Sequence, residues 1–248
     1  MAHISRHELK EDQFKSGIEQ FEEFVKTRYK DILTVAGIVV VVGGLALGLK
    51  LYREQQEAQA SEQLGAALKT FRAYVGTAGQ ASLLPGAETF PSARDKYKKA
   101  LEQFQAIVSK YSRFPQPKAV AIARYHVGVC QAQLGDHDAA VKTLEEAARD
   151  KDRELASLAQ FALAGEQLKA GKTDEAVKLY QELAARPTST VPEATAKLAL
   201  ADAYRATQPA RAREIYQQLE KQFGSDVAVA QVLKEQMASL PAPAGPPK

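Results

Sequence analysis

Cysteine is almost absent from this chain, and tryptophan is missing altogether. The single cysteine, Cys130, cannot form an internal disulfide, so a folded domain must be stabilised by burial alone. Cys130 lies in the apolar stretch VGVCQA, which predicts a small core residue.

Histidine is also scarce. The four that are present, His3, His7, His126 and His137, show no metal-ligand spacing. The sequence contains no phosphate-binding loop and no nucleophile motif either. We therefore expect a protein that is not an enzyme and that holds neither a metal nor a cofactor.

Charge of one sign is not in excess. The net charge is +3 over 248 residues, with acidic and basic residues interspersed, so no nucleic-acid footprint is expected. Alanine, leucine, glutamate, glutamine and lysine dominate the part after residue 52, where prolines fall almost entirely between helical segments. This composition indicates an all-α fold.

One long apolar run is present. Residues 32–49 read ILTVAGIVVVVGGLALGL, without a charge. A helix of this length covers about 27 Å, close to the hydrocarbon thickness of a bilayer. We expect a single transmembrane helix over residues 32–52. A buried core helix and a cleaved signal peptide are the alternatives.

The flanks of this run predict its orientation. Lys15, Lys26, Arg28 and Lys30 precede it, whereas Lys50, Arg53 and Lys69 follow it. The positive-inside rule then favours a cytoplasmic N-terminus. The chain is expected to be a single-pass membrane protein whose large C-terminal domain lies outside the cytoplasm, which in a bacterium is the periplasm of the inner membrane.

Residues 1–31 form the predicted cytoplasmic segment. Phe14, Ile18, Phe21 and Val25 recur at helical spacing and predict an amphipathic helix. It could lie on lipid headgroups or pack on a partner. Within the span, Gly44 and Gly48 form a G-x-x-x-G pattern that permits close helix packing, although glycine is common in membrane helices.

Four later segments share one pattern. An alanine is followed four residues on by a large apolar residue, and three residues later by another apolar or small one. This repetition indicates stacked helical hairpins in which the alanine marks a close crossing. The members are Ala100, Phe104 and Ile107; Ala140, Leu144 and Ala147; Ala176, Tyr180 and Leu183; and Ala212, Tyr216 and Leu219.

Turn residues divide the repeats. Gly135 and Gly171 end the first helix of two hairpins, just before Asp136 and Thr173 open the next helix. We expect a repeat domain over residues 53–240. Its parts are a divergent first repeat 54–112 with an irregular loop 76–91, repeats 120–154, 156–190 and 192–224, a capping helix 226–240, and then a disordered tail 241–248.

The pattern resembles the tetratricopeptide repeat over residues 93–223. The matching positions are Gly128, Gly135, Ala140, Ala147, Ala164, Gly171, Ala176 and Pro187. The resemblance implies a right-handed α-solenoid. The chain departs from the motif in lacking its first aromatic residue, in a period above 34, and in Thr207 where glycine is usual.

The whole layout resembles the YfgM-like family of inner-membrane proteins, on its architecture and on the entry KTRYKDILTVAGIVVVVGG. That resemblance implies an ancillary subunit of the Sec translocon. Its implied partners are translocon subunits, a membrane-anchored periplasmic chaperone and newly exported client proteins. It supplies no catalytic residues.

A concave surface lined by the first helix of each hairpin is the expected protein-binding site. Counting from the glycines predicts an apolar groove with a basic side, suited to helices or unfolded apolar segments. The alternative is that some of these side chains are core or are covered by the capping helix. The predicted lining residues are Ile122, Tyr125, Val129, Leu158, Phe161, Lys197 and Tyr204.

Three functions fit these features. The first is a non-catalytic, membrane-anchored module that assists protein export and the periplasmic chaperone network at the translocon. The second is a scaffold of another envelope complex, in division or secretion. The third is a homo-oligomeric adaptor that uses the face of Gly44 and Gly48 together with the groove.

Overall fold

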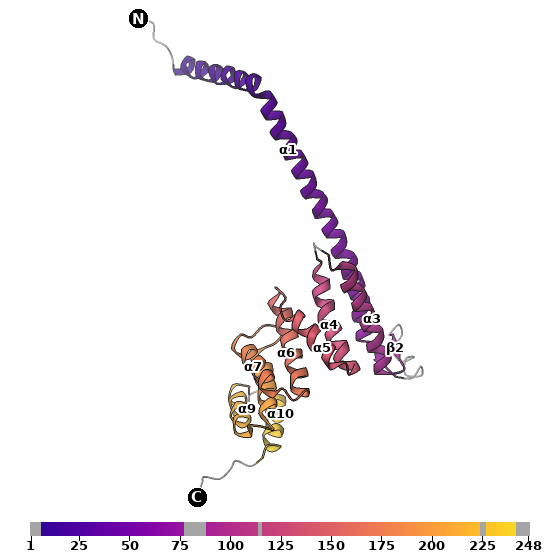
Figure 1. The fold of residues 1–248 in the computed structure, drawn as a ribbon. Helices are drawn as coiled ribbons and strands as arrows, with labels where there is room; N and C mark the ends of the chain where they lie inside the picture. The colour runs from indigo at the N-terminus through magenta and orange to yellow at the C-terminus, as the bar shows by residue number, and fades with distance from the viewer. Residues whose placement is uncertain (1–5, 77–87, 114–115, 224–226, 242–248) are drawn as a thin grey trace. The chain divides into compact units, whose positions relative to one another are not determined.

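The computed structural model describes the backbone of residues 6–76, 88–113, 116–223 and 227–241. Side chains are described within these ranges, apart from residues 6–27, Ile32 and residues 227–229. The chain divides into two compact units, Met1–Gln55 and Gln56–Lys248. The described elements are nearly all α-helices (Figure 1).

The first unit consists of the early part of helix α1 (Arg6–Phe71). Arg28 has non-helical backbone angles and marks a kink (Figure 1). From Arg28 onward, α1 is long and apolar enough to cross a membrane, with a mean hydropathy of 2.6 over its most apolar window. Its apolar side chains are exposed to solvent, as for Val40 at 73%. These observations establish a candidate span by length and composition.

The second unit begins with a hairpin. Residues 56–71 of α1 pack against α3 (Ala93–Tyr111). Ala60, Leu64 and Ala67 are buried there with Phe104. The side-chain amide of Gln63 donates a hydrogen bond of 2.9 Å to the Tyr111 hydroxyl. These contacts join the two helices into the first hairpin.

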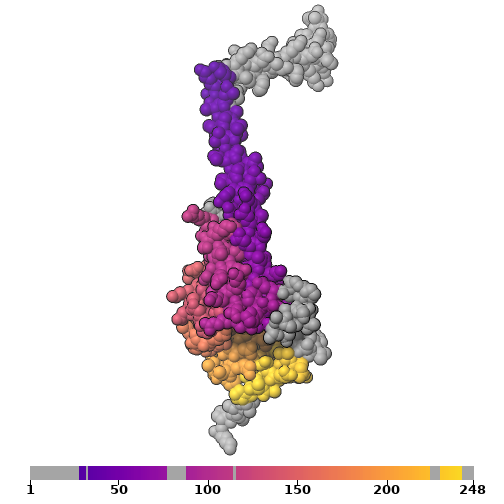
Figure 2. Space-filling view, turned by 90° about the vertical axis from the view of Figure 1, so that its right-hand side faces the viewer, coloured from indigo at the N-terminus to yellow at the C-terminus, as the bar shows by residue number. Residues whose placement is uncertain are grey.

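Three further hairpins follow. They consist of α4 (Lys118–Leu134) with α5 (His137–Ala147), α6 (Arg153–Lys169) with α7 (Thr173–Ala185), and α8 (Glu193–Tyr204) with α9 (Pro209–Phe223). Helix α10 (Val227–Ala238) then packs on α9. Each helix from α3 onward packs on its neighbours in sequence, and the colours of Figure 2 accordingly succeed one another through this unit. Such nearest-neighbour packing defines a helical solenoid.

The ends of the helices follow from local chemistry. Gly135 has φ of 87° and Gly171 has φ of 77°, left-handed conformations that suit glycine at a helix end. The Asp136 carboxylate then accepts a hydrogen bond from the N–H of Ala139 and caps α5. Asp152 caps α6 in the same way through the N–H of Glu154.

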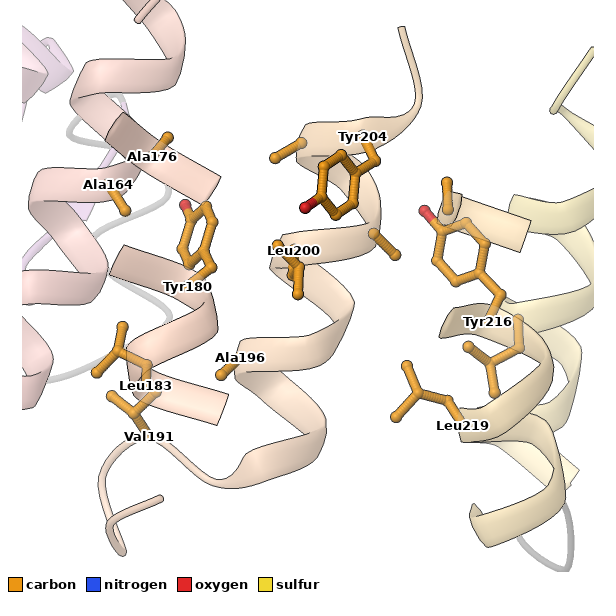
Figure 3. Packing of buried hydrophobic residues seen from close by; sticks show 14 of the residues in the cluster. Ala164, Ala176, Tyr180, Leu183, Val191, Ala196, Leu200, Tyr204, Tyr216 and Leu219 are labelled. Atoms are coloured by element: carbon orange, nitrogen blue, oxygen red, sulfur yellow. The ribbon is translucent and has the colours of Figure 1, made fainter. Parts of the chain in front are cut away.

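The repeated alanines lie where the helices cross. Ala100, Ala140, Ala176 and Ala212 are all 0% exposed. The large residue four positions later is buried in every hairpin, and Figure 3 shows Tyr180 in this role beside Ala164 and Ala176. This confirms the interpretation of the sequence pattern as a close crossing filled by a large apolar side chain.

A short β pairing was not predicted. Strand β1 (Tyr74–Val75) pairs in parallel with β2 (Thr89–Phe90), joining Tyr74 to Thr89 and Val75 to Phe90. The all-α prediction therefore needs this small correction. Two residues per strand give too little sequence pattern for the pairing to be recognised.

Some predictions concern residues outside those that the structure describes. The side chains of the amphipathic segment 1–31 are described only from Arg28 onward. Most of the loop 76–91 and nearly all of the tail 241–248 also lie outside the described residues. These predictions stay as they were made.

Candidate functional site

The buried residues of α4, α6 and α8 show how these three helices correspond. Ala123 in α4, Ala159 in α6 and Ala196 in α8 are each 0% exposed and occupy one equivalent position. The step from the first to the second is 36 residues, and the step to the third is 37. Two more buried sets repeat these steps: Val127, Leu163 and Leu200, and Cys130, Glu166 and Ala203.

The step from α6 to α8 is one residue longer than the step from α4 to α6, and the spacing within the hairpins shows why. From Ala164 to the crossing residue Ala176 there are 12 residues, but from the equivalent Ala201 to Ala212 there are 11. The spacing from the buried face of α8 to the crossing alanine of α9 is therefore one residue shorter than in the preceding hairpin, and Thr207 stands where glycine is usual. If a constant period of 36 residues is assumed, counting back from Ala212 assigns each position of α8 to the residue directly before the correct one.

Two of the predicted groove residues change their role for this reason. Leu198, and not Lys197, occupies the position in α8 that Tyr125 and Phe161 occupy in α4 and α6. Lys197 instead lies one residue away and forms an ion pair of 2.6 Å with Glu193.

Tyr204 is 4% exposed and belongs to the buried cluster, where its hydroxyl accepts a hydrogen bond from Gln181 at 3.0 Å. In Figure 3 its ring lies close to Leu200, which belongs to the same cluster. The prediction that Tyr204 lines an open groove is wrong, because the one-residue shift turns it into the core.

The other five predicted residues are half-buried. Ile122, Tyr125 and Val129 lie on α4, and Leu158 and Phe161 lie on α6. The Phe161 ring meets the Tyr180 ring edge-on at 5.4 Å, so one of its faces supports the core. Burial raises the pKa of the Tyr125 hydroxyl, which remains neutral at physiological pH. The row formed by Tyr125, Phe161 and Leu198 at one equivalent position of α4, α6 and α8 is therefore apolar and uncharged.

The corrected row continues into a small apolar cavity. Thr195 and Leu198 of α8 line it with Leu219, Phe223 and Leu233 from α9 and α10. Its volume of about 200 Å³ is below the range of about 300–1,000 Å³ typical of small-molecule sites. A single apolar side chain is an occupant of suitable size and chemistry.

The basic residues beside the row are held by partners in the same chain. The Lys169 ammonium lies 2.7 Å from the Glu166 carboxylate, whose other oxygen lies 2.6 Å from Nδ1 of His137. Burial acts to raise the pKa of Glu166, but the hydrogen bonds from Lys169 and His137 outweigh it and lower that pKa. Arg205 donates to Gln236 and Ser239 of the segment containing α10.

In the part of the chain that the structure describes, reactive side chains are not gathered in a catalytic arrangement. Cys130 is 0% exposed, and burial raises its pKa to about 12, which keeps it a thiol. No group of three or more His, Cys, Asp or Glu side chains that could hold a metal ion occurs among the residues described. The predicted core role of Cys130 is confirmed.

Gly44 and Gly48 belong to the first unit and are described separately. A Cβ atom added to either would meet nothing within 4 Å, so this face of the helix makes no contact within the described chain. A role in packing against another helix stays a prediction.

The fold defines a class of proteins built from stacked helical hairpins. The chain belongs to the tetratricopeptide repeat family, whose model matches residues 92–156 and 161–227, more than half of its length. This fold is typically a non-catalytic module for protein–protein interaction, and no enzymatic family is indicated.

Two solved structures are similar to this chain. One is a crystal structure of nearly identical TPR-like repeats from a putative kinesin light chain of Podospora anserina, and the other is a point variant of the same protein. Both are 16% identical with a TM-score of 0.50, and they cover 74% of this chain and 94–95% of their own. At this identity the likeness shows the fold alone. No curated protein matches the chain.

Sequence reasoning missed Leu198 and the cavity next to it. The chain held one signal that could have revealed them, the spacing of 11 residues from Ala201 to Ala212 in place of the 12 from Ala164 to Ala176. The predicted binding role of the row itself stays a proposal.

Proposed function

We propose that this protein is a membrane-anchored adaptor that binds apolar segments of other proteins on the first helices of its hairpins. The observation that carries the proposal is the row formed by Tyr125, Phe161 and Leu198 at one equivalent position of three successive helices. A partner segment lying across the helices could contact all three, as in other recognition modes that use a groove.

The surroundings of the row favour an apolar partner over a charged one. Lys169 and Arg205, the basic side chains beside the row, already have partners within the chain. Recruiting Lys169 to a carboxylate would remove one of the two hydrogen bonds of Glu166, and recruiting Arg205 would remove the hydrogen bond to Gln236. The cavity beside Leu198 offers instead a place for one apolar anchor.

Anchoring by the apolar part of α1 belongs to the same proposal. Tyr29 and Tyr52 bracket the run 32–49, and Arg28, Lys50 and Arg53 lie beside them. Aromatic and basic residues are enriched at the two interfaces of a membrane helix. We propose a single-pass protein of the bacterial inner membrane, with its N-terminus in the cytoplasm and its repeats in the periplasm.

The cellular role that we propose is assistance to protein export at the Sec translocon. This rests on the resemblance to the YfgM-like family, with translocon subunits, a membrane-anchored chaperone and exported clients as partners. An adaptor for apolar segments suits chains that emerge unfolded. A scaffold of a division or secretion complex is the competing function.

Site-specific photo-crosslinking in membranes would test this proposal. The crosslinker replaces Tyr125, Phe161 or Leu198 in turn, and captured proteins are identified by mass spectrometry. We expect translocon subunits, an envelope chaperone or nascent exported chains. Capture of division or secretion components alone would support the scaffold, and capture of only this chain would support a homo-oligomer.

A matched pair of variants at Thr195 makes the test specific for the row. Thr195 is exposed and lines the cavity, so Thr195→Phe would fill it without disturbing buried residues, whereas Thr195→Ser would leave it open. We expect Thr195→Phe to reduce crosslinking from Leu198, while helical content stays unchanged. Equal crosslinking in both variants would contradict a role for the cavity.

A further inference from the structure

A second cavity lies at one end of the third hairpin. It is lined by the start of α6, the end of α7 and the turn that follows, and none of the row residues line it. Its volume of about 540 Å³ falls within the range of about 300–1,000 Å³ typical of small-molecule sites. This cavity is therefore separate from the protein-binding row and large enough to hold a ligand of its own.

The walls of this cavity are fixed by hydrogen bonds. The Glu154 carboxylate accepts from the N–H of Thr190 at 2.9 Å and from the hydroxyl of Ser189 at 2.7 Å. The hydroxyl of Ser157, which is 4% exposed, lies 2.8 Å from the hydroxyl of Thr188. The turn after α7 is thereby tied to α6, so the cavity exists before any ligand enters.

The position of Arg153 adds to this rigidity. Its guanidinium donates to the carbonyl oxygens of Arg186 and Pro187 at 3.0 and 3.3 Å through one nitrogen, Nη2. A guanidinium has five N–H donors, so Nε and Nη1 remain available. Arg153 thus fixes the end of α7 and still presents donors at the cavity.

Two charges of opposite sign face the same space. Arg186 and Glu182 both line the cavity, and in the described part of the chain neither forms an ion pair within 4 Å. Ala156, Leu183 and Ala185 supply apolar surface between them. A guanidinium pairs with a carboxylate, and a carboxylate pairs with an ammonium group or N–H donor. The lining is therefore complementary to a ligand group that carries both a carboxylate and an ammonium group or N–H donor.

We propose that this cavity binds the amino-acid group, with Arg186 and Arg153 holding its carboxylate and Glu182 holding its nitrogen. A free amino acid and the C-terminal residue of a peptide share this chemistry. They differ at the nitrogen, which is an ammonium group in the first and an amide N–H in the second. This site is independent of the proposed adaptor function.

The proposal can be tested by NMR titration of the full chain in detergent, with the methyl signals of Ala156, Leu183 and Ala185 as reporters. The probes are alanine, N-acetylalanine and N-acetylalaninamide, the last of which lacks the carboxylate. We expect saturable shifts with the first two and none with the third. If alanine binds more tightly than N-acetylalanine, the ligand is a free amino acid. If N-acetylalanine binds more tightly, the ligand is the C-terminal residue of a peptide.

Charge variants complete the test. Arg186→Gln should weaken binding about tenfold, because it removes a charge-assisted hydrogen bond. Arg94→Gln, at an exposed arginine of α3 that does not line the cavity, should leave binding unchanged. Glu182→Gln should weaken alanine more than N-acetylalanine. Absence of saturable shifts, or equal binding by the Arg186 and Arg94 variants, would overturn the proposal.

Discussion

A Cβ atom on Gly128 would lie 2.7 Å from Cγ of Leu144 and 3.4 Å from its backbone nitrogen. Real Cβ atoms essentially never approach another atom to within 3.0 Å. Leu144 is 0% exposed, so its side chain can shift only by disturbing the core around it. The close crossing of helices α4 and α5 therefore favours glycine at position 128.

Gly128→Ala should lower the free energy of unfolding by about 1–3 kcal/mol, the usual cost of overpacking a core. Gly65→Ala is the matched control, because a Cβ atom at this position within α1 would meet nothing within 4 Å. That change should instead stabilise by about 0.5–1 kcal/mol. Urea unfolding followed by circular dichroism measures both, and a loss of stability of similar size in the two variants would contradict the close crossing.

Arg205 ties the last helix to the repeats. Its two terminal nitrogens donate to Gln236 at 2.8 Å and to Ser239 at 2.9 Å. Arg205→Ala should cost about 1–2 kcal/mol, since hydrogen bonds to a charged group are lost at a half-exposed site. In this variant, amide hydrogen exchange should be accelerated more in α10 than in α6. Lys178→Ala, at an exposed residue of α7, should leave the exchange of α10 unchanged.

Much of the repeat architecture could be predicted because it is encoded locally. The alanine followed by a large apolar residue fixes where helices cross, and Gly135 and Gly171 with their neighbouring caps fix where two of them end. Neither feature needs knowledge of distant contacts. The 11-residue spacing from Ala201 to Ala212 departs from this local rule, so counting with a constant period places Lys197 where Leu198 lies.

The features that sequence reasoning missed depend on contacts between distant residues. The cavity at the end of the third hairpin exists because Glu154 holds Ser189 and Thr190, which lie 35 and 36 residues away. The β1–β2 pairing likewise joins Tyr74 to Thr89 across the intervening loop. No periodic pattern marks such pairs, so only the three-dimensional arrangement reveals them.

Gly44 and Gly48 provide a test of self-association. Both present open space on one face of the candidate span, where a second helix could approach closely. Replacing both with Ile should reduce self-association in membranes if that face is a helix contact, as measured by energy transfer between labelled chains. Gly43→Ile is the control, because a Cβ atom there also meets nothing within 4 Å and Gly43, directly before Gly44, lies on a different face of the helix. Unchanged energy transfer in the double variant would discard this contact.

His126 should make the first hairpin sensitive to acid. Its ring stacks on Phe104 at 4.9 Å and meets Phe71 edge-on at the same distance, so it joins α4 to α3 and α1. Nδ1 is buried without a hydrogen-bond partner. Burial, helped by the positive charge of Arg72, lowers the pKa of His126 from 6.5 to about 4.

The direction of the pH effect follows from this shift. Between pH 6.5 and about 4 the unfolded chain binds a proton at His126 that the folded chain does not. The stabilisation is therefore complete above pH 6.5 and is lost as the pH falls towards about 4. A pKa shift of this size corresponds to a change of about 3 kcal/mol in the free energy of unfolding.

Urea unfolding of the full chain at a series of pH values measures this contribution. His126→Phe cannot titrate, so its stability should fall less steeply over the same window, whatever its stability at pH 7. Below pH 4.5 both proteins should lose further stability, because the pKa of Glu154 is lowered from 4.5 to about 2 and its contribution is lost over that range. Identical slopes for the two proteins between pH 6.5 and 4.5 would show that His126 is not held neutral by its packing.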